Sequence, residues 1–144
     1  MKVIVQRVKK ASVEVEKKIV GKINEGFMLL VGFTEGDDYN TILEMVKKVV
    51  NLRIMDDEFG IMNKSILDTK GSILSISQFT LYADTKKGNR PSYANAMKGE
   101  QASPLYDKFN EELKKYVPVE TGIFGSEMLV SLDNDGPVTI ILER

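Results

Sequence analysis

The sequence contains neither cysteine nor histidine among its 144 residues. Without cysteine the chain has no disulfide, no thiol nucleophile and no cysteine-ligated zinc. Without histidine it has no Ser-His-Asp triad, no imidazole general base and no histidine-ligated metal. An enzyme made from this chain must therefore use carboxylates, lysines, hydroxyl groups, backbone dipoles, or groups that its substrate supplies.

Long apolar stretches and a strong charge of either sign are also missing. The longest apolar run, residues 27–31, is far shorter than the roughly 20 residues of a membrane-spanning helix. The N-terminal residues 1–5 lead directly into a predicted strand and lack the apolar core of a signal peptide, so we expect a cytoplasmic protein. The net charge is −1, so any contact with RNA must use a local basic patch.

The apolar pattern predicts one mixed α/β domain over residues 1–144. Helices are expected over residues 39–51, where apolar residues follow the 3.6-residue period, over 92–98, and over 103–116, where Ser103 and Pro104 are typical first residues. Strands are expected over residues 2–9, 13–15, 18–23, 27–33, 52–55, 72–81 and 119–122. This order indicates β/β/α layers, with mixed sheets and helices packed on one side.

The end of the chain predicts a β-hairpin. Two apolar, β-branched runs, residues 128–132 and 138–142, flank Asn134, Asp135, Gly136 and Pro137. Pro137 cannot donate a hydrogen bond to a strand ladder, and Gly136 allows any φ. Either Gly-Pro simply ends a turn, or its peptide bond is cis and presents two carbonyl groups on one side.

A second stretch of interest is the predicted strand 72–81. Strand alternation places Gln78 and Thr80 on one face, where an apolar strand becomes polar. A buried amide and a buried hydroxyl need hydrogen-bond partners, so this is either a mutually satisfied pair at a strand end or part of a polar site.

Two charged loops each allow two interpretations. Asp56, Asp57 and Glu58 lack the alternating ligand spacing of a metal loop, so we favour a solvated turn. Residues 82–91 carry Lys86, Lys87 and Arg90, which could contact phosphates or be simply solvated.

Several of these stretches together resemble the D-aminoacyl-tRNA deacylases. The resemblance is carried by Ser77-Gln78-Phe79-Thr80-Leu81, Asn134-Asp135-Gly136-Pro137-Val138-Thr139, Val5-Gln6-Arg7-Val8, Gly88-Asn89-Arg90-Pro91-Ser92 and Thr121-Gly122-Ile123-Phe124-Gly125. It implies a homodimeric enzyme that hydrolyses the ester between a D-amino acid, or mischarged glycine, and the 3′ acceptor end of tRNA. We expect no cofactor, no metal, and neither DNA nor a membrane as a partner.

The resemblance also implies site residues. A cis bond between Gly136 and Pro137 would enter the partner subunit's pocket, where its carbonyl groups hold the amino group and exclude L side chains. The residues expected to support this motif are Gln6, Arg7, Asn134 and Thr139. The residues expected to form the catalytic stretch are Ser77, Gln78, Phe79 and Thr80. Candidate contacts with tRNA are Lys86, Lys87, Arg90, Phe124 and Gly125.

The chemistry without imidazole has two options. Thr80 as nucleophile needs a base, and none is adjacent in sequence. We favour the other option, in which Thr80 and the backbone N–H groups of Phe79 and Thr80 form an oxyanion hole and the 2′-hydroxyl of the terminal adenosine assists. Two other functions stay open: an RNA-binding module without chemistry that uses the basic loop, and a structural or small-molecule-binding dimer clasped by the hairpin tip.

Overall fold

The computed structural model describes all 144 residues and is organised around one long strand, β1 (Lys2–Val15). Along one edge of β1 lies the antiparallel strand β8 (Leu129–Glu143). Along the other edge lie β3 (Gly26–Gly32) beside the first half of β1 and β2 (Lys18–Ile23) beside the second half. The strands β6 (Ser72–Ser77) and β7 (Val119–Thr121) continue the sheet from β3 in parallel. In the single chain β8 is therefore an edge strand with one unpaired side.

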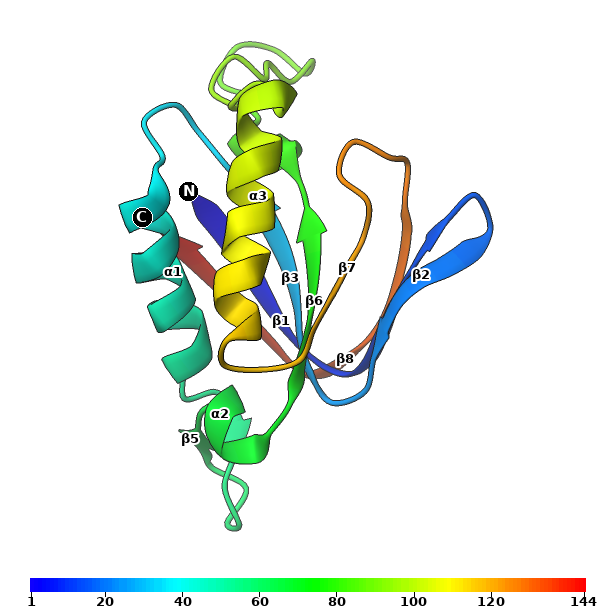
Figure 1. The fold of residues 1–144 in the computed structure, drawn as a ribbon, viewed down its shortest axis with the longest axis vertical. Helices are drawn as coiled ribbons and strands as arrows, with labels where there is room; N and C mark the ends of the chain where they lie inside the picture. Colours follow the sequence, from blue (N-terminus) through cyan, green and yellow to red (C-terminus); the bar gives the residue numbers. More distant parts are fainter.

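The helices cover one face of this mixed sheet. Figure 1 shows α1 (Tyr39–Asn51) and α3 (Gly99–Lys114) side by side in front of the strands. The short α2 (Ile66–Thr69) lies next to the small ribbon of β4 (Met55–Asp56) and β5 (Met62–Lys64). This arrangement confirms the predicted mixed α/β fold with helices on one side. No helix is long and apolar enough to cross a membrane.

Two apolar clusters hold the layers together. The larger cluster joins alternate residues of β3, such as Phe27 and Leu29, to buried residues of both helices, such as Ile42 and Phe109. The intervening residues of β3 and β6, such as Met28 and Leu74, point away from the helices. They pack on the second half of β1 and on β2, on residues such as Val13 and Ile23. The second half of β1 and β2 thus cover the face of the sheet that the helices leave open. Both faces of β3 are therefore buried, as its uninterrupted apolar sequence predicts.

The prediction of a hairpin at the end of the chain is wrong. Residues 128–132 and 138–142 do not pair with each other; both runs pair with β1 as parts of the single strand β8. Between the pairs Gln6–Thr139 and Val8–Asn134, residues 135–138 bulge out of the ladder opposite Arg7. Pro137 has no N–H to donate, so a bulge suits it, and the long β1 offers both runs a partner without a change of direction.

Three further predictions need correction. The predicted strand 72–81 ends at Ser77, and a 3-10 turn, η1 (Phe79–Tyr82), follows. Residues 92–98 are not helical, because Ser92 forms a bridge with Asp84 instead. The last helix begins at Gly99, so Pro104 lies inside α3 rather than at its start. It ends at Lys114, which leaves Tyr116 outside the helix and exposed.

The other predicted elements form close to their expected bounds. The helix 39–51 is confirmed as α1, whose N-cap Asp38 accepts a hydrogen bond from the Thr41 N–H at 3.0 Å. The expected strands 13–15 and 18–23 are confirmed as the end of β1 and as β2, which form a hairpin joined by Glu16 and Lys17 with φ of 50° and 65°. The expected strand 52–55 is reduced to β4.

Candidate active site

A cavity of about 560 Å³ opens at the carboxyl ends of β3 and β6. Its walls come from four segments of the chain: the end of β3, the exit of β6, the entry of α3, and the loop that leads into β8. The lining residues are Val31, Gly32, Phe33, Ile76, Ser77, Gln78, Phe79, Met97, Gly99, Ala102, Phe124, Gly125, Ser126, Met128 and Val130. Ligands of α/β proteins commonly bind at this edge of a sheet, since parallel strands bring several chain ends together there.

Gln78 and Thr80 meet at the rim of this cavity. The Gln78 side-chain amide donates a hydrogen bond to the Thr80 hydroxyl, and the Gln78 N–H donates to the Val31 carbonyl at 2.7 Å. Their proximity was predicted from strand alternation, but the strand has already ended. The 3-10 turn brings them together instead. Thr80 itself is half-buried and does not line the cavity.

The backbone of the turn offers further donors. Phe79 and Thr80 are the first residues of η1, so their N–H groups have no partner within the turn. The Phe79 ring is exposed and meets the Tyr93 ring edge to face, with centroids 5.1 Å apart. Because Ser77, Gln78 and Phe79 line the cavity and Thr80 is bonded to Gln78, the structure brings these four predicted residues together.

The predicted tRNA-contact residues fall into two groups. Phe124 and Gly125 line the cavity from the loop before β8. Lys86, Lys87 and Arg90 are exposed on the segment that connects η1 to α3, both of which border the cavity, and none of the three forms an ion pair. This segment is the loop at the top of α3 in Figure 1.

The Gly136–Pro137 bulge is a second, separate group. The bond between these residues is cis, and both residues are exposed. The adjacent Arg7 is only 6% exposed. It donates from Nε to the Asp135 carbonyl at 3.1 Å and from Nη1 to the Ile54 carbonyl at 2.8 Å.

The remaining predicted support residues lie around the same bulge. The Thr139 hydroxyl donates to Gln6 Oε1 at 2.5 Å, and Asn134 pairs with Val8 in the strand ladder. In β1 the bulge faces Arg7, whereas the cavity end of β3 pairs with Val3. Four residues of strand separate the two positions, roughly 13 Å. Within one chain, the bulge and the cavity do not meet.

The acidic turn is largely exposed to solvent, and two of its carboxylates also accept hydrogen bonds from neighbouring groups. Asp57 accepts hydrogen bonds from the N–H groups of Ile61 and Phe59, which lower the pKa of its carboxyl group. Asp56 accepts from Arg7 Nη1 at 3.0 Å and so reaches the bulge. The sequence interpretation missed this contact because the two residues lie far apart along the chain.

Tyr106 was also missed. It lies behind the cavity, is 2% exposed, and its ring centroid is 5.8 Å from that of Phe124. In the expected helix 103–116, Leu105, Phe109, Leu113 and Tyr116 recur at helical spacing and predict an apolar stripe; Phe109 and Leu113 are buried, whereas Leu105 is only partly buried. Ala102, Tyr106 and Phe109 are spaced to share one face of α3, and all three belong to the larger apolar cluster.

Comparisons with known proteins agree with this geometry. The model of the family described as D-Tyr-tRNA(Tyr) deacylase matches residues 4–143. A solved structure described as c-Myc DNA unwinding element binding protein is 43% identical, with 100% of this chain and 99% of that chain covered and a TM-score of 0.95. A structure described as a probable eukaryotic D-amino acid tRNA deacylase shares the fold at 17% identity, with 98% and 97% covered and a TM-score of 0.84. Since the family match spans nearly the whole sequence, the chain belongs to the D-Tyr-tRNA(Tyr) deacylase family.

Proposed function

We propose that this protein hydrolyses the ester bond of D-aminoacyl-tRNA and of mischarged glycyl-tRNA, releasing the amino acid and the tRNA. The observation that carries the proposal is the family match over residues 4–143 of a chain whose Ser77, Gln78 and Phe79 line its cavity. The apolar and aromatic walls of that cavity, which include Phe33, Phe124 and Met128, suit the flat base of a terminal adenosine. The ester bond then lies near the Gln78–Thr80 rim.

The chemistry uses the rim as an oxyanion hole. The hydrogen-bond partner of the Thr80 hydroxyl is the Gln78 amide, which donates and therefore cannot take a proton from Thr80. This favours Thr80 as a polar donor over Thr80 as an activated nucleophile. The N–H groups of Phe79 and Thr80 and the Thr80 hydroxyl stabilise the negative charge that develops on the ester carbonyl oxygen. The neighbouring ribose 2′-hydroxyl assists the attack of water or the departure of the leaving group.

Selection between mirror-image substrates requires a second subunit. The Gly136–Pro137 bulge lies too far from the cavity of its own chain to contact a substrate there. The unpaired edge of β8 and its exposed Leu129 and Ile141 favour association with a second copy of the chain. In the dimer, the carbonyl groups of Gly136 and Pro137 bind the amino group of the substrate in the partner's cavity. The same backbone occupies the space that an L side chain needs, so selection needs no contact with the side chain itself.

The tRNA body is held by charge. Lys86, Lys87 and Arg90 are exposed on the segment between η1 and α3 and form no ion pair with a carboxylate, so they are available to the phosphates of the acceptor end. Phe124 and Gly125 contact the terminal nucleotide within the cavity.

Substrate comparison tests the proposed function. Catalytic amounts of enzyme are incubated with D-tyrosyl-tRNA, L-tyrosyl-tRNA and glycyl-tRNA, and the released amino acid is measured. We expect release from the D and glycyl substrates and retention of the L ester. Salt-sensitive binding of tRNA without release would instead favour the RNA-binding module, and a monomer in solution would contradict the dimeric site.

A further inference from the structure

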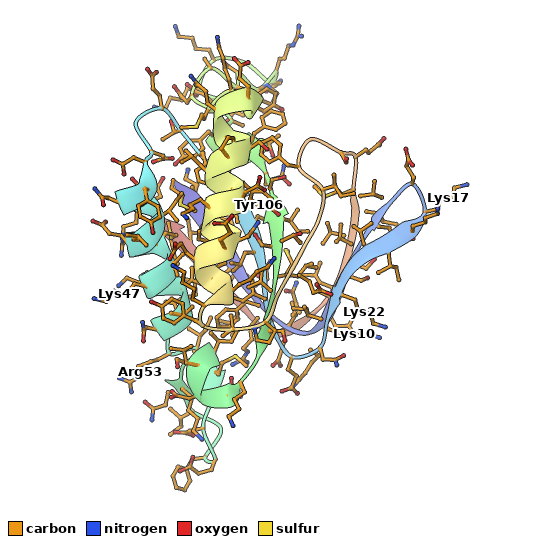
Figure 2. The ribbon with its side chains drawn as sticks, viewed as in Figure 1. Lys10, Lys17, Lys22, Lys47, Arg53 and Tyr106 are labelled. Carbon is orange, nitrogen blue, oxygen red and sulfur yellow. The ribbon has the colours of Figure 1, made fainter.

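Tyr106 places a hydroxyl group in the protein interior, directly behind the cavity wall. Figure 2 shows the residue on α3, and its hydroxyl donates a hydrogen bond to the Ser75 carbonyl of β6 at 2.7 Å. Burial raises the pKa of the Tyr106 hydroxyl above its ordinary value, so the group stays protonated and remains a donor.

The Ser75 carbonyl is shared between the helix and the loop that forms one cavity wall. The Gly122 N–H donates to the same oxygen at 3.3 Å. Gly122 begins the segment that carries Phe124, Gly125 and Ser126, all of which line the cavity. The carbonyl therefore fixes the start of this segment to β6, and Tyr106 fixes the position of the carbonyl.

The Tyr106 ring makes a second contact with the same segment. Its centroid lies 5.8 Å from that of Phe124, with the two ring planes tilted by 45°. Tyr106 is thus linked to the segment in two ways, indirectly through the Ser75 carbonyl that Gly122 also contacts, and directly through Phe124.

The polar groups around Tyr106 are only partly satisfied by hydrogen bonds. The Ser75 hydroxyl oxygen and Asn110 Oδ1 are buried nearby without hydrogen-bond partners. Buried polar atoms that lack partners destabilise a fold, and apolar residues of similar size would pack there more favourably. A polar cluster in this place therefore needs a reason other than stability.

We propose that Tyr106 is a positioning residue for the substrate: it holds the segment 122–126, and with it Phe124, at the cavity width that the terminal adenosine requires. This inference rests on the proposed function for the identity of the ligand. Tyr106 does not touch the substrate and acts through Ser75 and Phe124.

The test compares two variants, each of which loses one tyrosine hydroxyl group that forms a hydrogen bond between α3 and another element. Tyr106→Phe removes the bond to Ser75, whereas the control Tyr39→Phe removes the bond from Tyr39 to Glu112 Oε1 at 2.9 Å, away from the cavity. We expect Tyr106→Phe to raise KM for D-tyrosyl-tRNA about three- to tenfold, as the loss of one hydrogen bond would, with kcat changed less than about twofold. Tyr39→Phe should leave both constants unchanged. A similar KM in all three proteins, or equal changes in both variants, would overturn the inference.

A binding measurement makes the test independent of turnover. Adenosine is titrated into the wild-type protein and into both variants and followed by calorimetry. Weaker binding by Tyr106→Phe alone supports the inference, and equal affinity in the three proteins, or no binding by the wild type, contradicts it. If the wild-type protein binds adenosine but releases no D-tyrosine, the proposed function is rejected. The adenosine affinities of the variants would then still show whether Tyr106 positions the cavity wall.

Discussion

Arg7 donates a hydrogen bond from Nε to the main-chain oxygen of Asp135 at 3.1 Å, and so fastens the middle of β1 to the bulge of β8. The guanidinium group is nearly buried and lies between two carboxylates, with Asp56 at 3.0 Å and Asp135 at 3.3 Å. It also satisfies the Ile54 carbonyl. One cation thus connects the acidic turn, the first strand and the last strand.

Replacement of Arg7 by Met should therefore disturb both stability and selectivity. The change leaves Asp56, Asp135 and the Ile54 carbonyl without their common donor, which should lower the free energy of unfolding by about 2–3 kcal/mol in urea titrations. We also expect the variant to hydrolyse L-tyrosyl-tRNA measurably faster relative to the D ester. Arg53→Met is the matched control, because Arg53 is exposed and bonds only Asn63 of the neighbouring β5 strand. Unchanged stability and selectivity in Arg7→Met would contradict this assignment.

Replacement of Gly136 by Ala adds only a methyl group, but it should lower both the stability of the fold and the discrimination against L esters. Gly136 has φ of +120°, and an added Cβ would lie 2.8 Å from Val138 Cγ2 and 3.2 Å from Arg7 Nη2. We expect destabilisation of roughly 1–3 kcal/mol and loss of discrimination against L esters. Gly88→Ala is the control, since Gly88 also has a positive φ, +75°, but nothing lies within 4 Å of its added Cβ. Equal effects of the two changes would mean that the crowding at Gly136 is unimportant.

Replacement of Thr80 by Ala separates the two chemical roles of this residue. If Thr80 is one donor of an oxyanion hole, the rate should fall by roughly 10²- to 10³-fold and activity should persist, because the backbone donors remain. In the wild-type enzyme, mass spectrometry of quenched reactions should detect no acyl group attached to Thr80. Detection of that adduct in the wild-type enzyme would establish the nucleophile instead.

The participation of the substrate needs its own test. A D-aminoacyl-tRNA that ends in 2′-deoxyadenosine lacks the assisting hydroxyl, so single-turnover hydrolysis should be far slower than with the ribose substrate. Equal rates for the two substrates would leave the reaction without its proposed assistance.

Charge reversal at the basic loop should weaken tRNA binding. The triple change Lys86→Glu, Lys87→Glu and Arg90→Glu removes up to three phosphate contacts, so the affinity should fall at least about tenfold and the salt dependence should become shallower. The control reverses Lys17, Lys18 and Lys22, which are exposed on the β1–β2 hairpin. Figure 2 shows Lys17 and Lys22 on this hairpin, away from the loop at the top of α3. Comparable losses in both triple variants would indicate a general effect of net charge.

Sequence patterns predicted an element correctly where several of them indicated the same element. The helix α1 formed over its predicted residues because the Asp38 cap and the 3.6-residue apolar period indicate the same element. The helix α3 did not, because Pro104 resembles a helix start, whereas the observed helix begins earlier at Gly99 and tolerates the proline.

The sequence singled out residues that lie together in the structure, but not the architecture that places them there. The two apolar runs around Gly136 and Pro137 carry the usual pattern of a hairpin, and only the distant strand β1 decides that both runs pair with it. Pairing between the first and the last strand of the chain cannot be predicted from the local sequence of either strand. The same holds for Tyr106 and Asp56, whose partners Ser75 and Arg7 lie in other elements.

The bulge in β8 has a consequence for how such a protein can change. From Val5 to Ala11 the first strand advances six residues, while its partner advances eight, from Leu132 to Ile140. Ile140 after the bulge packs on the larger apolar cluster, whereas Leu132 before it packs on the smaller one, so the two flanks serve different cores. Because residues 135–138 lie outside the ladder, a change in their number would leave the pairs Gln6–Thr139 and Val8–Asn134 in place. A lineage can reshape what this corner recognises while its sheet remains as it was.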